Sequence, residues 1–476
     1  MRGMRHRVVL LAASLALTIP SAAQAADPGC TKFASPTGAD SAVGSAAEPF
    51  RTAQRLADSL AAGQTGCLRA GSYTGGLSIG KGGVSETQRV TIRAYSGEKA
   101  TLAGRVVVRK GANFVTVEQL HLDGRNAENL PSPTVNANDV TFRRNDVTNF
   151  HTAICFVLGA SNVDNSVANG RAARTVIALN RIHNCGKLPA TNHHHGIYVE
   201  GTDHARITGN WIYDNADRGI QLYPDAQHTT VTDNVIDGNG TGIIFSGDQG
   251  ISSHDSVVEH NVITNARLRF NVESWYPSGT PAGRNNILRS NCVHGSARKD
   301  YGPGGIATAD GGFTATSNTV ADPLYVDRSA KDFTLRPESA CAALVGAEQT
   351  PGPGAEPGPV APPPAIDPPP RGSKPAPRKK PKRVSRARKV TLSATTATRS
   401  SARRRPRRIE LVGRVIATDS RRTVRIQVRT ARGWRNVARL TTRGRRAFHV
   451  SLPRRRSWQR FRAVAPGLGV SRVVRL

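Results

Sequence analysis

The sequence predicts an all-β fold: a right-handed parallel β-helix (a solenoid), followed by a Pro-rich linker and a small antiparallel β-sandwich. Three observations lead to this prediction. A phrase of glycine followed by apolar residues recurs every 23 residues in the middle of the chain. A segment dense in proline comes next, and the last part of the chain alternates apolar and charged residues in short runs.

The N-terminus has the pattern of a secretory signal peptide. Positively charged residues precede an apolar stretch from Val8 to Pro20, and Ala23-Gln24-Ala25 is a small-x-small cleavage site. The apolar stretch is too short to span a membrane, and we expect no transmembrane segment later in the chain. Residues 1–25 are therefore expected to be removed, which leaves a secreted or cell-wall-associated protein.

Residues 26–346 are predicted to form the β-helix. Its repeated glycines are Gly196, Gly219 and Gly242. A second phrase, asparagine followed by an apolar strand, occurs at Asn145, Asn180, Asn210, Asn234, Asn261 and Asn291. One coil of such a repeat cannot bury its own apolar residues, so the coils must stack. We expect the asparagines to lie in tight turns, where Asn tolerates left-handed backbone angles, and to bond to the turns above and below.

Six cysteines remain after removal of the signal peptide, and an even number in an exported chain favours disulfides. Sequence alone permits 15 pairings. We expect the sequential one, in which each pair joins neighbouring coils or a terminal cap: Cys30–Cys67, Cys155–Cys185 and Cys292–Cys341. No pair has the spacing of a zinc site.

The charge of the chain is confined to its C-terminal part. Residues 371–476 contain 34 Lys or Arg and two acidic residues, a balance of +32, which equals the formal charge of the whole chain. Residues 347–387 hold 13 prolines and should form an extended linker. Residues 388–476 are predicted to form the β-sandwich from five alternating runs, at 390–392, 409–415, 423–428, 447–452 and 460–464.

Several phrases resemble right-handed parallel β-helix proteins of the pectate-lyase-like superfamily. Residues 33–38, 48–52 and 67–73 resemble the N-terminal cap and first coil, and residues 322–327 with 332–335 resemble the last coil before a C-terminal cap. The resemblance covers nearly all of residues 30–346 and implies this scaffold and a polysaccharide ligand. The tail, around Gly433–Ala438 and Phe461–Gly467, resembles β-sandwich modules appended to exported bacterial proteins.

Strand alternation places candidate ligand-binding residues on one outer face. After each repeat glycine, the first residue should point inward and the next outward. This alternation predicts two outward rows, if Arg269–Glu273 is the next strand. The first row is Tyr198, Gln221, Ile244 and Asn271. The second row is Glu200, Tyr223, Ser246 and Glu273. Insertions at 185–195, 247–254 and 275–286 flank this face, as is usual beside a binding surface. The expected substrate-binding residues are Tyr198, Gln221, Tyr223, Asp248, Glu273, Trp275 and Tyr276.

The chemistry expected at this face is proton transfer on a sugar polymer. Lyase chemistry needs a base and a cation or Arg that neutralises a uronate carboxylate. We expect His194, His195, Arg218 and Glu200 to be catalytic, with Arg269 as a further cation. The sequence names no cofactor, and Ca²⁺ is the candidate if a cation is needed. A glycoside hydrolase, the second choice, would use two carboxylates, from Glu200, Glu273, Asp248 and Asp217.

Other interpretations stay open at this point. The run His193–His195 also fits a solvated loop, Glu200 and Glu273 fit ordinary outer-face positions, and Trp275 and Tyr276 fit packing under their own loop. His204, His228 and His254 are expected to form a structural row at a turn. The paired aspartates of polygalacturonases and the Asp-Pro-His-Glu phrase of mannuronan epimerases are absent, and no Lys/Arg pair of the chondroitinase and alginate-lyase branch can be placed. The alternative function is a non-catalytic carbohydrate-binding or surface structural protein.

The cationic tail, residues 371–476, predicts a polyanionic partner. An exported chain does not meet chromosomal DNA, so we expect an anionic cell-wall polymer and no specific nucleic acid. Arginine dominates the tail, and its guanidinium favours bidentate contacts with phosphate or carboxylate. A charge that only aids solubility is the other interpretation. We expect the protein to be a monomer whose body binds an extracellular polysaccharide.

Overall fold

The computed structural model describes residues 29–160, 170–344 and 351–353, and the C-terminal strands between Lys389 and Arg475. The chain divides into two compact units, Met1–Ala361 and Pro362–Leu476. The expected signal peptide, residues 1–25, lies outside the described residues, and so does nearly all of the expected linker, residues 347–387. Within the described ranges, no helix is long and apolar enough to cross a membrane.

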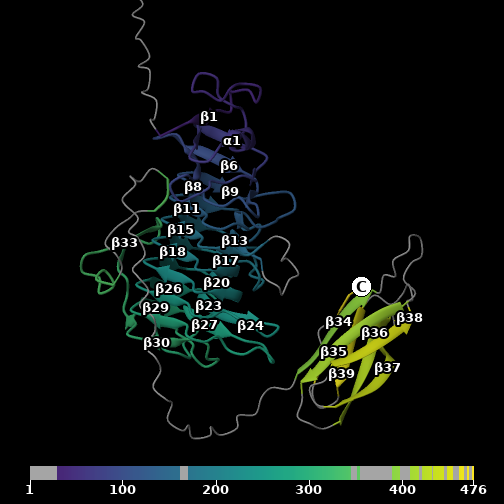
Figure 1. Ribbon diagram of the computed structural model, residues 1–476. Helices are drawn as coiled ribbons and strands as arrows, with labels where there is room; N and C mark the ends of the chain where they lie inside the picture. Colours follow the sequence, from purple (N-terminus) through teal and green to yellow (C-terminus); the bar gives the residue numbers. More distant parts are fainter. Residues whose placement is uncertain are drawn as a thin grey trace, which may run out of the picture. The chain divides into compact units, whose positions relative to one another are not determined.

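The first unit is a parallel β-helix made of three long sheets, to which each coil contributes in turn (Figure 1). Sheet A consists of β1 (Lys32–Ala34), β2 (Thr65–Leu68), β5 (Val90–Ala94), β8 (Val115–Glu118), β11 (Thr141–Arg143), β15 (Val176–Ala178), β18 (Arg206–Thr208), β21 (Thr230–Thr232), β25 (Val257–Glu259), β28 (Ile287–Arg289) and β30 (Thr314–Thr316). Sheet B consists of β3 (Gly71–Tyr73), β6 (Ala100–Ala103), β9 (His121–Asp123), β12 (Asp146–Thr148), β16 (Arg181–His183), β19 (Trp211–Tyr213), β22 (Val235–Asp237), β26 (Val262–Ala266), β29 (Cys292–Ser296) and β31 (Thr319–Val320).

Sheet C is the third wall of the solenoid. It consists of β4 (Leu77–Ile79), β7 (Val106–Val108), β10 (Thr134–Val135), β13 (Phe156–Gly159), β17 (Ile197–Asp203), β20 (Arg218–Gln227) and β23 (Thr241–Asp248), with β14 (Ala172–Ala173) beside β17 and β27 (Val272–Trp275) beside β23. The short strand β24 (Ile251–Ser252) turns back antiparallel on β23. All other pairs in sheet C are parallel.

The core is a set of inward rows that stack from coil to coil, as the alternation predicts. In sheet A one row runs through Ile92, Val117, Phe142, Ile177, Ile207, Val231, Val258 and Leu288, and all are fully buried. Each such side chain contributes about 1.5–3 kcal/mol when it leaves water. Each coil therefore depends on its neighbours for burial of its apolar side chains, as expected for a repeated sequence.

Buried asparagines form a ladder at the corner between sheets A and B. Each Nδ2 donates to the Oδ1 of the next coil at 2.9–3.0 Å, through Asn145, Asn180, Asn210, Asn234, Asn261, Asn291 and Asn318. The expected bonding between turns is confirmed. The expectation that the asparagines themselves have left-handed backbone angles was wrong. Positive φ falls on the residue before each asparagine, for example Arg144, Leu179 and Asp233.

The two ends of the solenoid are closed differently. Helix α1 (Ala53–Ser59) lies at the first coils and buries Leu56 (Figure 1). At the other end, residues 322–335 do not form a last coil, as their resemblance suggested. They form an antiparallel hairpin, β32 (Tyr325–Asp327) with β33 (Asp332–Leu335), that packs Phe333 onto the outer side of sheet B at Trp211 and Tyr213. The hairpin therefore shields these aromatic rings from solvent.

The sequential disulfide pairing is confirmed. Cys30–Cys67 joins the segment before β1 to β2, Cys155–Cys185 joins two neighbouring coils, and Cys292–Cys341 ties the segment after the hairpin to sheet B. No free cysteine remains.

The second unit consists of two antiparallel sheets. One contains β34 (Lys389–Thr396), β35 (Arg408–Ile416) and β38 (Ala447–Pro453). The other contains β36 (Arg421–Thr430), β37 (Gly433–Arg443), β39 (Arg460–Ala465), β40 (Gly469–Val470) and β41 (Val474–Arg475). The five predicted runs all fall on strands. Strand β37 was missing from them because its charged residues interrupt the apolar alternation.

Candidate functional site

The outer side of sheet C carries residues of both predicted rows, with a change at the end of each. In the first row, the register pairs Tyr198 with Gln221 and Gln221 with Ile244. The next partner is Glu273, not Asn271 as expected. In the second row, Ser246 pairs with Trp275 and not with Glu273. The amide of Asn271 is buried and donates to the carbonyls of residues 294, 295 and 304, so this residue holds a corner and the strand begins after it.

Two tyrosines form an aromatic surface on this face. The rings of Tyr198 and Tyr223 stack with centroids 6.1 Å apart, and the Tyr223 hydroxyl donates to Oδ2 of Asp248 at 3.1 Å. Strand β17 has a bulge between Val199 and Gly201, at the level of the buried Glu200. The structure therefore gathers four predicted residues, Tyr198, Glu200, Tyr223 and Asp248, on neighbouring strands.

Trp275 and Tyr276 lie in different surroundings. Trp275 pairs with Ser246 and is 47% exposed. Tyr276 is partly buried against Gly283 and Gly312, and burial raises its pKa to about 12. Only Trp275 of the two presents a large surface to solvent.

The insertion at residues 186–195 is held by one carboxylate. Asp217 accepts backbone N–H groups from Asn192, His193 and His194 at 2.8, 2.9 and 2.8 Å. We name residues 186–195 the His loop. Asp217 was considered only as a hydrolase carboxylate in the sequence, but its oxygens are already used to fix this loop.

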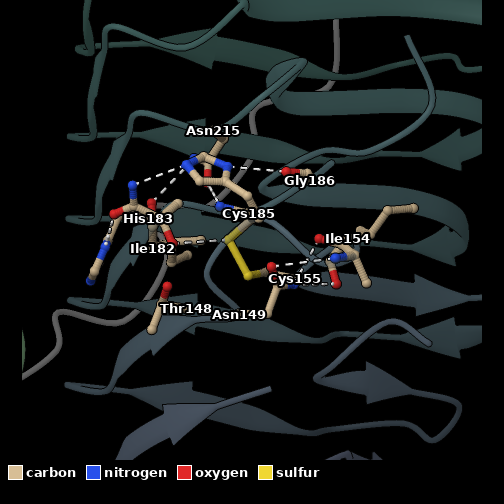
Figure 2. Close-up of a disulfide and its surroundings, with 12 residues drawn as sticks. Thr148, Asn149, Ile154, Cys155, Ile182, His183, Cys185, Gly186 and Asn215 are labelled. Atoms are coloured by element: carbon tan, nitrogen blue, oxygen red, sulfur yellow. Dashed lines mark hydrogen bonds between the residues drawn. A yellow bond between two sulfur atoms is a disulfide. The ribbon is translucent and has the colours of Figure 1, made fainter. Parts of the chain in front are cut away.

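A disulfide fixes the start of the His loop (Figure 2). Cys185 bonds to Cys155 of the previous coil, and its backbone N–H donates to Oδ1 of Asn215 at 2.9 Å. At the other end, the carbonyl of His195 accepts the N–H of Cys155 at 3.1 Å. Both ends of the loop are thus tied to the solenoid, and the side chains between them have defined positions.

The three histidines of the loop have three different environments. His193 is exposed. His194 is partly buried, its Nδ1 lies 2.8 Å from Oγ1 of Thr191, and burial with the nearby Lys187 lowers its pKa. His195 is 3% exposed, its ring meets Tyr198 edge to face, and burial together with Arg218 brings its pKa well below the ordinary value. His194 and His195 are therefore neutral at pH 7.

A short relay orients the His194 ring. The Thr191 hydroxyl lies 3.5 Å from Oδ2 of Asp217, a carboxylate that can only accept. When Thr191 donates to Asp217, its oxygen accepts from His194, so Nδ1 carries the proton. The second ring nitrogen, Nε2, is then unprotonated. Within the described part of the chain it has no hydrogen-bond partner, and it is available as a base.

Arg218 is a buried cation beside this loop. Its Nη1 and Nη2 donate to the carbonyl and to Oδ1 of Asn192 at 3.1 and 2.6 Å, and it is 7% exposed. Burial lowers its pKa, and the charges of Glu273 and Asp217 act in the opposite direction. Its Nε is buried and has no hydrogen-bond partner among the described residues. A desolvated guanidinium with an unused donor is expected to attract an anion.

A cavity of about 190 Å³ opens next to Arg218. Its lining comes from the His loop and from the corners that precede β20, β23 and β27: Ala190, Asn192, Asp217, Arg218, Gly240, Thr241, Leu268 and Arg269. Arg269 also pairs with the buried Glu273, Nη2 to Oε2 at 2.6 Å. The predicted residue Glu273 is therefore neutralised by its own neighbour.

Reasoning from the sequence named His195 and Arg218 as candidate site residues but missed that they belong to one row. The residues before the repeat glycines, His195, Arg218 and Thr241, occupy equivalent positions in three consecutive coils, and all are buried. We name them the entry row. The repeat itself could have shown them, since each directly precedes Gly196, Gly219 or Gly242.

A second polar cluster, on sheet B, was also missed. Asp146 lies between two histidines, 3.3 Å from Nδ1 of His121 and 2.8 Å from Nε2 of His183. The two histidines lower its pKa despite its burial. Across the described ranges, no group of three or more His, Cys, Asp or Glu residues is arranged to hold a metal ion. Of the expected turn row, His204 and His228 are found, with ring centroids 4.6 Å apart and positive φ at both. His254 was wrongly included, because it pairs with Gln227, and Asp255 has the positive φ in that coil.

Comparisons with known proteins agree with this architecture. Residues 134–320 match the family described as right handed beta helix region. This stretch is a right-handed parallel β-helix. No curated protein sequence matches the chain.

Solved structures with a similar fold include two lyases and one sugar complex. The pectate lyase Pel9A matches 65% of this chain and 90% of its own, with 13% identity and a TM-score of 0.44. A rhamnogalacturonan lyase matches 67% and 95%, with 12% identity and a TM-score of 0.41. XylC in complex with xylose matches 56% and 69%, with 12% identity and a TM-score of 0.39. These likenesses concern the fold alone.

Proposed function

We propose that this chain is a secreted or cell-wall-associated polysaccharide lyase that acts as a monomer on an extracellular, uronate-containing polymer. The observation that supports the proposal is a buried cation that lines a cavity, with a candidate base on the loop that contributes Ala190 and Asn192 to the lining. Arg218 lines the cavity, and His194, neutral and with Nε2 available, lies on the loop that forms one of its walls. A buried cation with an unused donor favours an anionic ligand.

In the proposed reaction, Arg218 binds the carboxylate of a uronate residue and makes its C5 proton more acidic. His194 Nε2 removes that proton, the electron pair forms the C4–C5 double bond, and the C4–O bond to the next sugar breaks. The leaving oxygen takes a proton from Tyr198 or from water. His195 supports Tyr198 through its edge-to-face contact, and Tyr198, Gln221 and Tyr223 extend the polymer-binding surface.

The carboxylates favour a lyase over a glycoside hydrolase. A hydrolase needs one carboxyl group that donates a proton and a second that attacks or activates water. Glu273 is paired with Arg269, Asp217 is engaged by three backbone N–H groups, and Asp248 accepts from Tyr223. The side chains that could serve a hydrolase are thus largely committed to other bonds.

The test uses purified mature protein and a panel of uronate polymers, including polygalacturonate and alginate. A lyase produces ultraviolet absorbance from the new double bond, whereas a hydrolase produces reducing ends without it. Each assay runs with Ca²⁺ and with a chelator, which tests Ca²⁺ as an additional cation. His194→Gln should abolish turnover but keep binding, and Arg218→Met should weaken both.

The exposed His193 provides the control, as His193→Gln should act like the wild type. If the protein binds glycans without turnover, and His194→Gln does not change that binding, the protein is a non-catalytic carbohydrate-binding protein and not an enzyme. If Arg218→Met binds the polymer as tightly as the wild type does, the cavity is not the polymer-binding site.

We further propose that the cationic tail, residues 371–476, holds the protein near an anionic cell-wall polymer. The charge balance of +32 in this part of the chain supports this. A chain that ends at Ala361, the boundary of the first unit, should lose cell-wall binding but keep its activity on soluble polymer. Equal wall binding by the shortened chain would contradict the anchoring role.

A further inference from the structure

The second unit carries an ordered polar strip on the outer side of one sheet. In β36, Val424, Ile426 and Val428 are buried, so the residues between them point outward. The register brings Gln427 opposite Asn436 of β37 and Arg462 of β39. It also brings Arg429 opposite Trp434. We name Gln427, Arg429, Trp434, Asn436 and Arg462 the tail strip.

Arg462 is held in a fixed orientation within the tail strip. Its Nε donates to Oε1 of Gln427 at 2.9 Å, and its guanidinium carbon lies 4.3 Å from the centroid of the Trp434 ring. Gln427 is in turn fixed, since its Nε2 donates to Oδ1 of Asn436 at 2.9 Å. A guanidinium ordered in this way loses little rotamer entropy when it binds a ligand.

In the described strands of this unit, Nη1 and Nη2 of Arg462 make no hydrogen bond or ion pair. The acidic residue of those strands, Glu410, belongs to the other sheet, on β35. Arg425 and Arg429 stand exposed on the same side of β36 as Gln427. An anion from another molecule can therefore bind at this surface.

We propose that the tail strip binds the carboxylates of an acidic polysaccharide, with the two Nη groups of Arg462 as the bidentate donor. A carboxylate matches the guanidinium fork. Gln427 bonds to Oδ1 of the exposed Asn436, and among the described strands Nδ2 of Asn436 remains for a neighbouring sugar hydroxyl. Phosphate polymers offer the same oxyanion fork, but polyphosphate has no hydroxyls to use this amide. The inference rests on the anchoring half of the proposed function and assigns it to one face.

The experiment measures binding of full-length mature protein to polygalacturonate, inorganic polyphosphate and neutral dextran at moderate salt. Two substitutions keep the charge unchanged. Arg462→Lys removes the fork, while Arg435→Lys changes an exposed arginine whose register partner is the inward Val428. We expect Arg462→Lys to weaken polygalacturonate binding about tenfold and Arg435→Lys to leave it unchanged. Asn436→Ala should weaken polygalacturonate binding and not polyphosphate binding.

The outcomes separate this inference from the anchoring proposal. If both lysine variants bind as tightly as the wild type, the attraction is diffuse charge, the strip is not a site, and anchoring by the tail still stands. If Arg462→Lys weakens the binding of polyphosphate more than the binding of polygalacturonate, the tail strip is a phosphate-binding site and the assignment to an acidic polysaccharide is wrong. If the wild type binds none of the anionic polymers, both proposals fail. Circular dichroism of each variant checks that the sheets persist.

Discussion

Replacing Asp217 with asparagine tests whether one carboxylate holds the His loop in place. Asp217 accepts three backbone N–H groups, from Asn192, His193 and His194, all within 2.9 Å. The substitution keeps the size of the side chain and removes its charge. It therefore leaves packing intact and changes only the ability to accept these bonds.

The geometry fixes the size of the effect. One oxygen of Asp217 accepts Asn192, and the other accepts both His193 and His194. An asparagine has a single oxygen, so its NH₂ group must face at least one of these backbone donors. Charge-assisted hydrogen bonds contribute about 1.5–3 kcal/mol each. The loss of one and the weakening of the others should destabilise the closed loop by about 3 kcal/mol, on the order of a hundredfold in its opening equilibrium.

Hydrogen exchange measures this opening directly, since loop amides exchange through local unfolding. We expect the amides of residues 192–194 to exchange on the order of a hundredfold faster in Asp217→Asn, and those of strand β20 to change little. The matched control is Asp214→Asn, which removes a partly exposed pair with Lys331. Its effect should stay within about 1 kcal/mol, as for other surface pairs.

Two results would refute the reasoning. Loop amides that exchange within a few-fold of the wild type would show that the disulfide and the backbone hold the loop without Asp217. Equal acceleration in Asp214→Asn would show a general loss of stability. Under the proposed function, a loosened loop should also slow turnover, because Asp217 orients His194 through Thr191.

Three further predictions concern stability. Asn234→Ala removes bonds on both sides of the asparagine ladder and should lower the free energy of unfolding by about 4 kcal/mol in urea, while Asn318→Ala, at the half-buried end, should cost less than half of that. Because the pKa of His195 is lowered, the unfolded chain binds a proton that the folded chain does not, so stability should fall by about 1.4 kcal/mol per unit as pH drops below about 6.5. His195→Gln should flatten this part of the profile of melting temperature against pH, and an unchanged profile would contradict it. Replacing both Cys292 and Cys341 with serine removes a disulfide that joins residues 49 positions apart in the sequence. This should destabilise the attachment of the hairpin by about 4 kcal/mol, which new trypsin cleavage at Arg336 would show. A hairpin that stays protected would mean that its other contacts, among them Phe333 with Trp211 and Lys331 with Asp214, hold it without the disulfide.

The sequence predicts sheet C well until its spacing changes. The glycines at a constant interval predict the pairing of Tyr198, Gln221 and Ile244 without error. The prediction fails at Asn271, because the corner before it is longer than its predecessors. Three carbonyls from residues 294–304 determine where Asn271 lies. No pattern within one coil contains that information.

The site shows the same limit more strongly. The role of Asp217 depends on backbone N–H groups, which leave no mark in a sequence. The pair Arg269–Glu273 has the spacing of a helical pair, but this segment is a corner and a strand, so spacing gave no reason to join them. The cover over Trp211 comes from Phe333, far along the chain. Composition and period predict the scaffold, whereas contacts between coils decide which polar groups remain available.

The position of the proposed site follows from the glycines that define the repeat. A Cβ on Gly219 would come within 2.9 Å of the Gly242 carbonyl oxygen and of a methyl group of Ile236, so the coils pack closely only with glycine there. The residue before each glycine lies at the corner that leads into sheet C, and it is not part of the apolar core. In the entry row this position holds His195, Arg218 and then Thr241 in successive coils. A solenoid can thus place a buried cation and a neutral imidazole one coil apart without disturbing the stack beneath them, and the insertion that forms the His loop supplies the wall that turns this corner into a cavity.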